Sequence, residues 1–262
     1  MLVIACSAPS LPGRPTSEVI TPAQAQAVVR DYWKMSEQAS MHRDARLFAQ
    51  IETGFLRESD EASIKVDLAL GNPALAAARP LRHVTVYVPH QRGYPAEFAV
   101  LIETVQVDAT RTPIDAPLSL YEHFVQTSSR DSWKADFYAQ VNTGRTFHFA
   151  LDSAGYATAL PVGDSRFVLR PDRLATAFAA YQQSGVQSGA PSGPFAEGPM
   201  TSDSIDLQRA HHDNLALLGY QEATDFRVLP FVYAYRGADG GAIVLFALRP
   251  SNTVTNRTRR RA

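Results

Sequence analysis

One order of elements occurs twice along this chain, and the duplication constrains the fold more than any other feature. Each occurrence begins with a helix that has proline in its first turn, at Pro22 and at Pro171. Each continues into β-branched and aromatic runs of period two, which are typical of strands. The two prolines lie 149 residues apart, and Tyr87 and Tyr233 in the strands that follow lie 146 apart. Two landmarks with nearly one offset indicate an internal repeat.

In the first copy, helical spacing of apolar residues extends from Pro22 to Leu70, with a pause at Gly54 and a stop at Gly71-Asn72-Pro73. Thr21 and Gln24 form a capping-box pattern at its start. The apolar stripe comprises Ala25, Val28, Val29, Tyr32 and Trp33. The period then changes to two, which predicts strands at residues 83–88, 98–107, 118–127 and 133–141.

The second copy repeats this order more briefly. Its pattern predicts a helix from Pro171, a loop at 185–199, a helix at 201–218 and strands at 226–235 and 242–248. Counterparts of the last two strands of the first copy would fall near residues 264–288, beyond Ala262. We therefore expect a truncated or frame-shifted second copy that lacks its closing hairpin. Residues 251–262 are basic and lack interleaved aromatics, so we expect a disordered tail and no nucleic-acid patch.

Helices followed by antiparallel strands predict the α+β class. The expected organisation is a tether at 1–19, a first domain at 20–160, an incomplete second domain at 161–250 and the tail at 251–262. The formal net charge of −1 argues against a nucleic-acid binder. No run approaches the roughly 20 apolar residues that span a bilayer.

The first residues resemble a bacterial lipobox. Val3-Ile4-Ala5 precede Cys6, the single cysteine of the chain, and a proline-rich segment suited to a tether follows. This pattern predicts lipidation of Cys6 and an extracytoplasmic protein anchored to the outer face of the bacterial cell membrane. Only five residues precede Cys6, which is too short for a complete signal peptide. The alternative is a cytosolic protein with a chance cysteine.

Helices followed by a curved sheet, with Ser132-Trp133-Lys134 in a late strand, resemble the nuclear-transport-factor-2-like cone. That superfamily includes SnoaL-type cyclases and ketosteroid isomerases. Residues 20–25, 51–54 and 239–244 further resemble a family of bacterial secreted lipoproteins with tandem cone-like domains. The resemblance implies two cone-like units of helices on a curved antiparallel sheet and an extracytoplasmic location, and it implies no activity.

Few patterns in the sequence carry recognisable chemistry. His211-His212-Asp213 is the densest titratable cluster, but neighbouring helical residues point about 100° apart, so we expect a solvated helix face and no metal. His42-Arg43-Asp44 copies part of a kinase catalytic loop without the other kinase motifs. Nucleotide and dinucleotide fingerprints are absent, so no cofactor is predicted.

A cone fold can place an acid–base pair in a pocket, and six residues are candidates for its lining. They are Tyr32, Trp33, Tyr87, His83, Glu103 and His123. Asp136 is a further acid that such a pocket would use. The alternative is that Tyr32 and Trp33 belong to the core, while His83, Glu103, Glu122 and His123 lie on a solvated or partner-facing side of the sheet.

The leading expectation is a non-catalytic, membrane-tethered binding or scaffold lipoprotein with an unknown protein or small-molecule ligand. The alternatives are a small-molecule enzyme of the SnoaL or ketosteroid-isomerase type and a purely structural envelope protein. A cavity that contains a perturbed carboxyl group would favour the enzyme, and a cone filled with apolar side chains would favour the scaffold.

Overall fold

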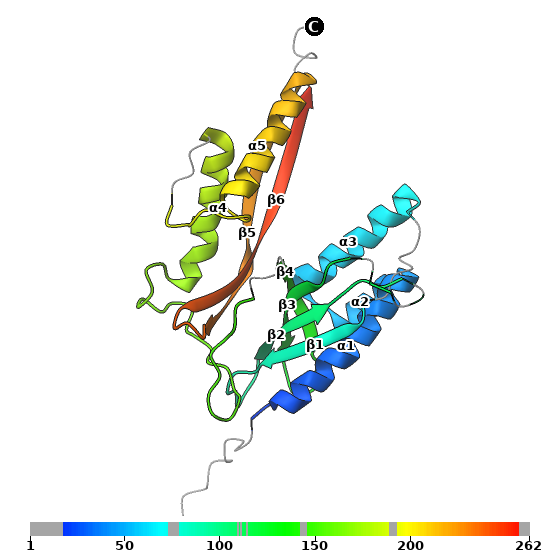
Figure 1. Cartoon of the computed structure of the whole chain (residues 1–262), viewed down its shortest axis with the longest axis vertical. Helices are drawn as coiled ribbons and strands as arrows, with labels where there is room; N and C mark the ends of the chain where they lie inside the picture. Colours follow the sequence, from blue (N-terminus) through cyan, green and yellow to red (C-terminus); the bar gives the residue numbers. More distant parts are fainter. Residues whose placement is uncertain are drawn as a thin grey trace, which may run out of the picture. The chain divides into compact units, whose positions relative to one another are not determined.

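The structure, a computed structural model, describes residues 18–72, 79–108, 110, 112–113, 115–141, 146–188 and 193–256. The chain forms two compact units that meet between Thr158 and Ala159, and the sequence placed the boundary at residue 160. Each unit combines helices with an antiparallel sheet of its own, so the predicted α+β class is confirmed (Figure 1). Cys6 and residues 257–262 lie outside the described residues.

Unit 1 begins with three helices, α1 (Pro22–His42), α2 (Ala45–Ile51) and α3 (Gly54–Leu70). The predicted capping box is confirmed, because the Thr21 hydroxyl accepts from the Gln24 amide and the Thr21 amide donates to Gln24 Oε1. Gly71 ends α3 with φ of 66°, a left-handed conformation that suits glycine.

The helical run of unit 1 is interrupted where the sequence predicted continuity. Arg43 adopts a left-handed conformation with φ of 52° and ends α1. Asp44 then caps α2, and its carboxylate accepts from the amides of Arg46 and Leu47. This side-chain cap satisfies amides that a continuing helix would bond to backbone carbonyls, and so a new helix starts in a new direction.

Four strands complete unit 1: β1 (Leu81–Tyr87), β2 (Ala96–Thr104), β3 (Leu118–Gln126) and β4 (Lys134–Val141). They pair antiparallel in chain order, as a meander. The predicted strand ranges differ from these by at most three residues. Because side chains alternate between faces, the register divides this sheet into a helix-facing row and an opposite row.

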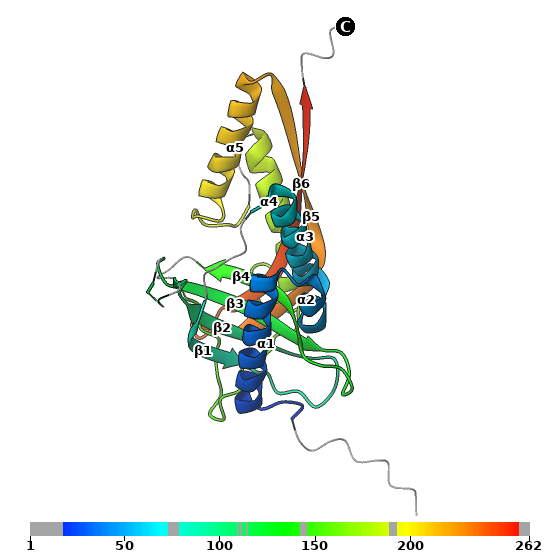
Figure 2. The same ribbon diagram turned by 90° about the vertical axis from the view of Figure 1, so that its right-hand side faces the viewer.

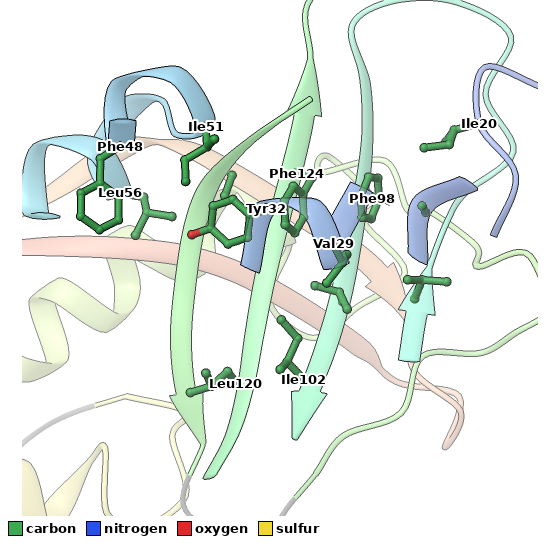
Figure 3. Close-up of a cluster of buried hydrophobic side chains, with 14 of the residues drawn as sticks. Ile20, Val29, Tyr32, Phe48, Ile51, Leu56, Phe98, Ile102, Leu120 and Phe124 are labelled. Atoms are coloured by element: carbon green, nitrogen blue, oxygen red, sulfur yellow. The ribbon is translucent and has the colours of Figure 1, made fainter. Parts of the chain in front are cut away.

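The helices of unit 1 cover one face of the sheet (Figure 2). Tyr32 of α1 packs edge-on against Phe124 of β3 at 5.1 Å between ring centroids, and Phe124 stacks on Phe98 of β2 at 4.9 Å (Figure 3). On the opposite face, Tyr87 stacks on Phe149 at 4.3 Å. The buried core of the helix-facing side also includes Val29, Phe48, Ile51, Leu56, Val100, Ile102 and Leu120.

Unit 2 contains α4 (Pro171–Ser188), α5 (Ser202–Leu217), β5 (Tyr220–Arg236) and β6 (Ala242–Asn256). Figure 1 shows α4 and α5 on one side of the long β5–β6 hairpin. The helix start at Pro171 matches the prediction. The predicted loop at 185–199 begins too early, because Gly185 belongs to α4 and lies against α5. A Cβ at Gly185 would lie 2.3 Å from Ile205 Cδ1, so the close approach requires glycine.

The strands of unit 2 are longer than the sequence predicted. Residues 251–256 were assigned to a disordered tail, and this is wrong, because β6 extends to Asn256 and pairs with 220–225. The polar sequence Ser251-Asn252-Thr253 carries no apolar alternation, and Pro250 disfavours a central strand. Pro250 is tolerated because, among the described residues, β6 pairs with β5 alone and its other edge has no strand beside it.

A helix must be both long and apolar to cross a bilayer, and no helix in the described part of the chain meets both conditions.

Replacing Phe124 with alanine is expected to lower the free energy of unfolding of unit 1 by about 3–5 kcal/mol, because it removes a fully buried ring that contacts Tyr32 and Phe98. Urea unfolding followed by tryptophan fluorescence measures this, since Trp33 and Trp133 are the two tryptophans of the chain and both lie in unit 1. Phe147→Ala, at a ring that is 57% exposed, is the matched control and should change stability by less than about 0.5 kcal/mol. Equal effects of the two variants would contradict this account of the core.

Candidate functional site

The apolar stripe of α1 changes character halfway along the helix. After Tyr32, the same face continues with Ser36 and Ser40, because residues four apart lie one turn apart on one side. Two short serines do not fill the space between the helix and the sheet, and a cavity of about 300 Å³ lies there. This volume is at the lower end of the range of small-molecule sites. Its walls are formed by Tyr32, Trp33, Ser36, Glu37, Ser40, Met41, Leu56, Asp60, Arg79, Leu120, Glu122 and Tyr138.

Two acidic residues on these walls occupy positions where strand alternation and helical spacing predict apolar side chains. Glu122 stands between Leu120 and Phe124 in the helix-facing row of β3. Asp60 stands four residues after Leu56 and four before Ile64 on the buried face of α3. Glu122 was expected on a solvated or partner-facing side of the sheet, and Asp60 was not among the candidate residues. The sequence did contain a signal for both residues, because each is a single acidic residue within a row of apolar residues.

Glu122 is 4% exposed, so its expected place on a solvated side of the sheet is wrong. Its Oε2 atom accepts no hydrogen bond from the described residues. Burial, together with the charge of Asp60, raises the pKa of Glu122 to about 8. The group is therefore a protonated acid at neutral pH, and it ionises when a neighbour stabilises its charge.

Glu52, at the end of α2, is fully buried behind this wall. Its Oε1 accepts a hydrogen bond from the Tyr32 hydroxyl at 3.0 Å. Burial first, and the charge of Asp60 second, raise the pKa of Glu52 to about 9. Burial also raises the pKa of Asp60, and a hydrogen bond with Glu52 partly opposes that rise. Glu52 therefore keeps its proton at neutral pH.

Trp33 and Arg79 carry further polar groups of the cavity wall, and each of these groups has a hydrogen-bond contact. The Trp33 indole nitrogen donates to the carbonyl of Arg79 at 2.6 Å, which fixes the ring on the wall. Arg79 is the one basic residue among the lining residues, and its guanidinium lies 3.4 Å from Gln106 Oε1. The cavity therefore combines acidic groups and aromatic rings with little compensating positive charge.

The six predicted lining residues divide between the two faces of the sheet. Tyr32 and Trp33 line the cavity, and Tyr32 also belongs to the core. Tyr87 and His123 are buried on the opposite face. His83 and Glu103 are register partners on that opposite face too, and both are exposed. The structure thus brings two of the six together.

His123 forms a separate buried polar group, and the expected solvated position is wrong for it as well. Its ring is 0% exposed, and Nδ1 lies 2.8 Å from Asp136 Oδ1. Glu97 Oε2 lies 3.9 Å from Nε2. Burial of the imidazole is compatible with the fold because both ring nitrogens face carboxylates. His123 and Asp136 are not among the residues that line the cavity between α1, α3 and the sheet.

The expected solvated face of helix α5 is found for His211, whose side chain is 61% exposed, and for Asp213, which is exposed as well, whereas His212 is 21% exposed. The Nε2 atoms of the two histidines lie 3.4 Å and 3.1 Å from Glu222 Oε2 of β5, and His212 also contacts the Thr224 hydroxyl at 3.2 Å. Two adjacent helical residues reach one carboxylate because β5 runs beneath the helix and Glu222 lies between them. Within the described ranges, no three His, Cys, Asp or Glu side chains gather as metal ligands.

Comparison with known proteins gives a family and distant structural likenesses, among them one to a chloroplast protein. A family model described as a domain of unknown function (DUF8094) matches residues 16–260. No curated protein matches the chain. The intermembrane space region of the chloroplast protein ARC6 is similar over 47% of this chain and 97% of its own, at 12% sequence identity and a TM-score of 0.35. A TM-score at this level does not establish a common fold.

The raised carboxyl pKa values predict that unit 1 loses stability as the pH rises. Between about pH 4.5 and 8, the folded state keeps protons on Glu52 and Glu122 that the unfolded chain releases, so folding becomes less favourable across this window. Glu122→Gln removes one such group and should raise the free energy of unfolding by about 1–3 kcal/mol near pH 9, with little change near pH 5. Tryptophan-monitored urea unfolding at both pH values measures the difference.

The matched control is Glu103→Gln, which removes an exposed carboxylate from the opposite face of the sheet. It should leave the pH dependence of the wild-type protein unchanged. A wild-type stability that increases from pH 5 to pH 9 would contradict the assignment of protonated buried acids.

Proposed function

The chain belongs to the DUF8094 family, and we propose that unit 1 of this member is a binding module for a small molecule. The ligand occupies the cavity between α1, α3 and the sheet. The observation that carries the proposal is Glu122, a carboxyl group that lines the cavity, is 4% exposed and has no hydrogen-bond partner for Oε2 among the described residues. An unsatisfied buried polar atom costs about 1–3 kcal/mol, and a ligand that bonds to this carboxyl group reduces that cost.

Binding is favoured over a purely structural role because the interior of unit 1 is not filled on this side. Ser36 and Ser40 stand where larger apolar residues would pack against Leu56 and Leu120. A scaffold gains nothing from this space or from an acid on its wall. A ligand site gains volume, shape and a polar contact.

An enzyme of the isomerase type is the second candidate, and the Glu52–Asp60 pair favours it. Asp60 lines the cavity, while Glu52 retains its proton and accepts a hydrogen bond from Tyr32. Two carboxyl groups with different proton affinities can transfer protons next to a carbonyl group, and a cavity with perturbed carboxyl groups is the feature expected of an enzyme. The binding role ranks first because it needs only the cavity and Glu122, whereas the enzyme also needs proton transfer by Asp60.

The architecture is interpreted as a tandem arrangement of nuclear-transport-factor-2-like cones. Supporting this, α1–α3 lie on one face of a four-stranded meander in unit 1, and unit 2 repeats two helices followed by two antiparallel strands. Pro22 and Pro171 begin corresponding helices. The module is further proposed to be exported and held at the outer face of the cell membrane by an acylated Cys6, as the lipobox resemblance and the proline-rich segment after it imply.

A small molecule in the cavity should shift the indole N–H resonance of Trp33 in the NMR spectrum of the full chain and leave that of Trp133 unchanged. Trp33 lines the cavity, whereas Trp133 packs on Phe98 with ring centroids 5.0 Å apart. A fragment library of neutral, cationic and anionic compounds provides the probes. Ser36→Leu, which fills the cavity, should abolish the shifts, and Ser59→Leu at an exposed position of α3 should preserve them.

The same fragments separate the two candidate functions. A ketone whose α-protons exchange with solvent deuterium faster in the presence of the wild-type protein than with Asp60→Asn would support the isomerase. Saturable Trp33 shifts without exchange support the binding module. A library in which no compound shifts the Trp33 resonance would refute the small-molecule site.

Acylation of Cys6 is expected when the full-length gene is expressed in a bacterium fed a radiolabelled fatty acid. The labelled protein should appear in the membrane fraction, because a lipidated cysteine inserts its acyl chains into the bilayer. Cys6→Ser should remove both the label and the membrane association. An unlabelled product found wholly in the cytosol would defeat the anchor.

A further inference from the structure

We propose that the cavity of unit 1 selects an organic cation, an amine or quaternary ammonium group that Glu122 and Asp60 neutralise and that aromatic rings enclose. This inference rests on the proposed function, because it assumes that the cavity binds a small molecule. It adds the chemical class of the ligand, which a cavity alone does not determine.

The charges around the cavity lead to this assignment. Glu122 from β3 and Asp60 from α3 both line it, and the charge of Asp60 raises the pKa of Glu122 further. Glu37 of α1 adds a third carboxylate to the wall. Glu122 is 4% exposed, and its Oε2 has no hydrogen-bond partner among the described residues. A cation placed there replaces the proton that Glu122 holds and relieves the repulsion between the two acids.

The aromatic rings on the walls favour an organic cation over a hydrated metal ion. Tyr32, Trp33 and Tyr138 line the cavity together with the two acids. The negative faces of such rings attract alkylammonium groups, and tryptophan does so most strongly. Trp33 is held in place by its hydrogen bond to the Arg79 carbonyl, so its ring is preorganised. A metal ion would require several oxygen ligands in a closed shell, and apolar rings do not supply them.

Anions and neutral compounds fit these walls less well. An anion would meet Glu122, Asp60 and Glu37 among the lining residues. Arg79 is the single basic lining residue, and its side chain is directed to Gln106. A neutral compound leaves Glu122 protonated and gains no charge-assisted contact from it.

Cation binding is therefore linked to proton release. The groups that face Glu122 from the surrounding elements are Tyr32 and Glu37 of α1, Asp60 of α3, Tyr138 of β4 and Arg79 before β1. Below about pH 8 the cation must displace the proton of Glu122, so affinity for a cation that does not itself titrate rises by up to about tenfold per pH unit and levels off above that pH. The affinity of an uncharged compound of the same shape should not rise with pH in this way.

The test compares choline with 3,3-dimethylbutan-1-ol, which has nearly the same shape and carries no charge. Isothermal titration calorimetry with the full chain at pH 6.5 and pH 8.5, in two buffers of different ionisation enthalpy, gives affinity and protons released. At pH 8.5 choline should bind at least about tenfold more tightly than the alcohol, a difference expected of a desolvated cation–carboxylate contact. At pH 6.5 its advantage should fall, and close to one proton should be released per choline bound.

Glu122→Gln, which keeps the shape of the side chain, should remove the preference for choline and the proton release. Asp60→Asn serves as the second variant and should weaken choline binding in the same direction. Glu103→Gln on the opposite face of the sheet is the matched control and should behave as the wild type does. Together these outcomes would support the organic cation.

Three results would overturn the inference. Equal binding of choline and the alcohol would show a cavity without charge selection, so the proposed binding function would stand and the cation would not. Choline binding that Glu122→Gln leaves intact would place the cation elsewhere. No binding of either probe, while other fragments still shift the Trp33 resonance, would also refute the cation and leave the binding function supported by its own experiment.

Discussion

Burial of carboxyl groups between the helices and the sheet is the constraint on which the chemistry of unit 1 depends. A carboxylate moved from water into an apolar interior loses hydration that a protein rarely replaces in full. Glu52 meets part of this cost by keeping a proton and by accepting a hydrogen bond from Tyr32 at Oε1. Glu122 keeps a proton as well, and the Oε2 atoms of both residues lack a hydrogen-bond partner among the described residues. Unit 1 is therefore most stable when both carboxyl groups are protonated, and a cation placed beside Glu122 would favour its ionised form.

The positions of these acids separate the part of unit 1 that serves the fold from the part that we propose for binding. Leucine at position 122 would join Leu120 and Phe124 in one apolar row, and leucine at position 60 would join Leu56 and Ile64. Packing alone would favour those residues, because they remove an unsatisfied group and fill space. Sequences depart from local consistency mainly at functional sites. The departures here converge on one cavity, which is the physical reason to place function there.

Sequence patterns predicted the elements of unit 1 well because each strand alternates and each helix carries a regular stripe. They failed where a local device overrides the period, as at Arg43, where a left-handed residue and the Asp44 cap split the helix. They also failed at residues 251–256, where pairing with β5 and not side-chain pattern maintains the strand. Tyr32 and Trp33 were candidate lining residues from the α1 stripe. Asp60 was not, because an acid on a helix is usually solvated and only the assembled unit shows which face α3 buries.

Unit 2 provides an internal comparison that separates scaffold from site. At the predicted offset of 149 residues, Tyr181 corresponds to Tyr32 and Gly185 to Ser36. Tyr181 is likewise buried, and it packs against Phe195 with ring centroids 5.0 Å apart. At Gly185, however, the space is occupied by Ile205 of α5, whose side chain would collide with any added Cβ. A buried tyrosine at this helix position therefore serves the fold in both units. The serine-lined space and the acids around it are not required by that fold, so their presence in unit 1 is best explained by what they bind.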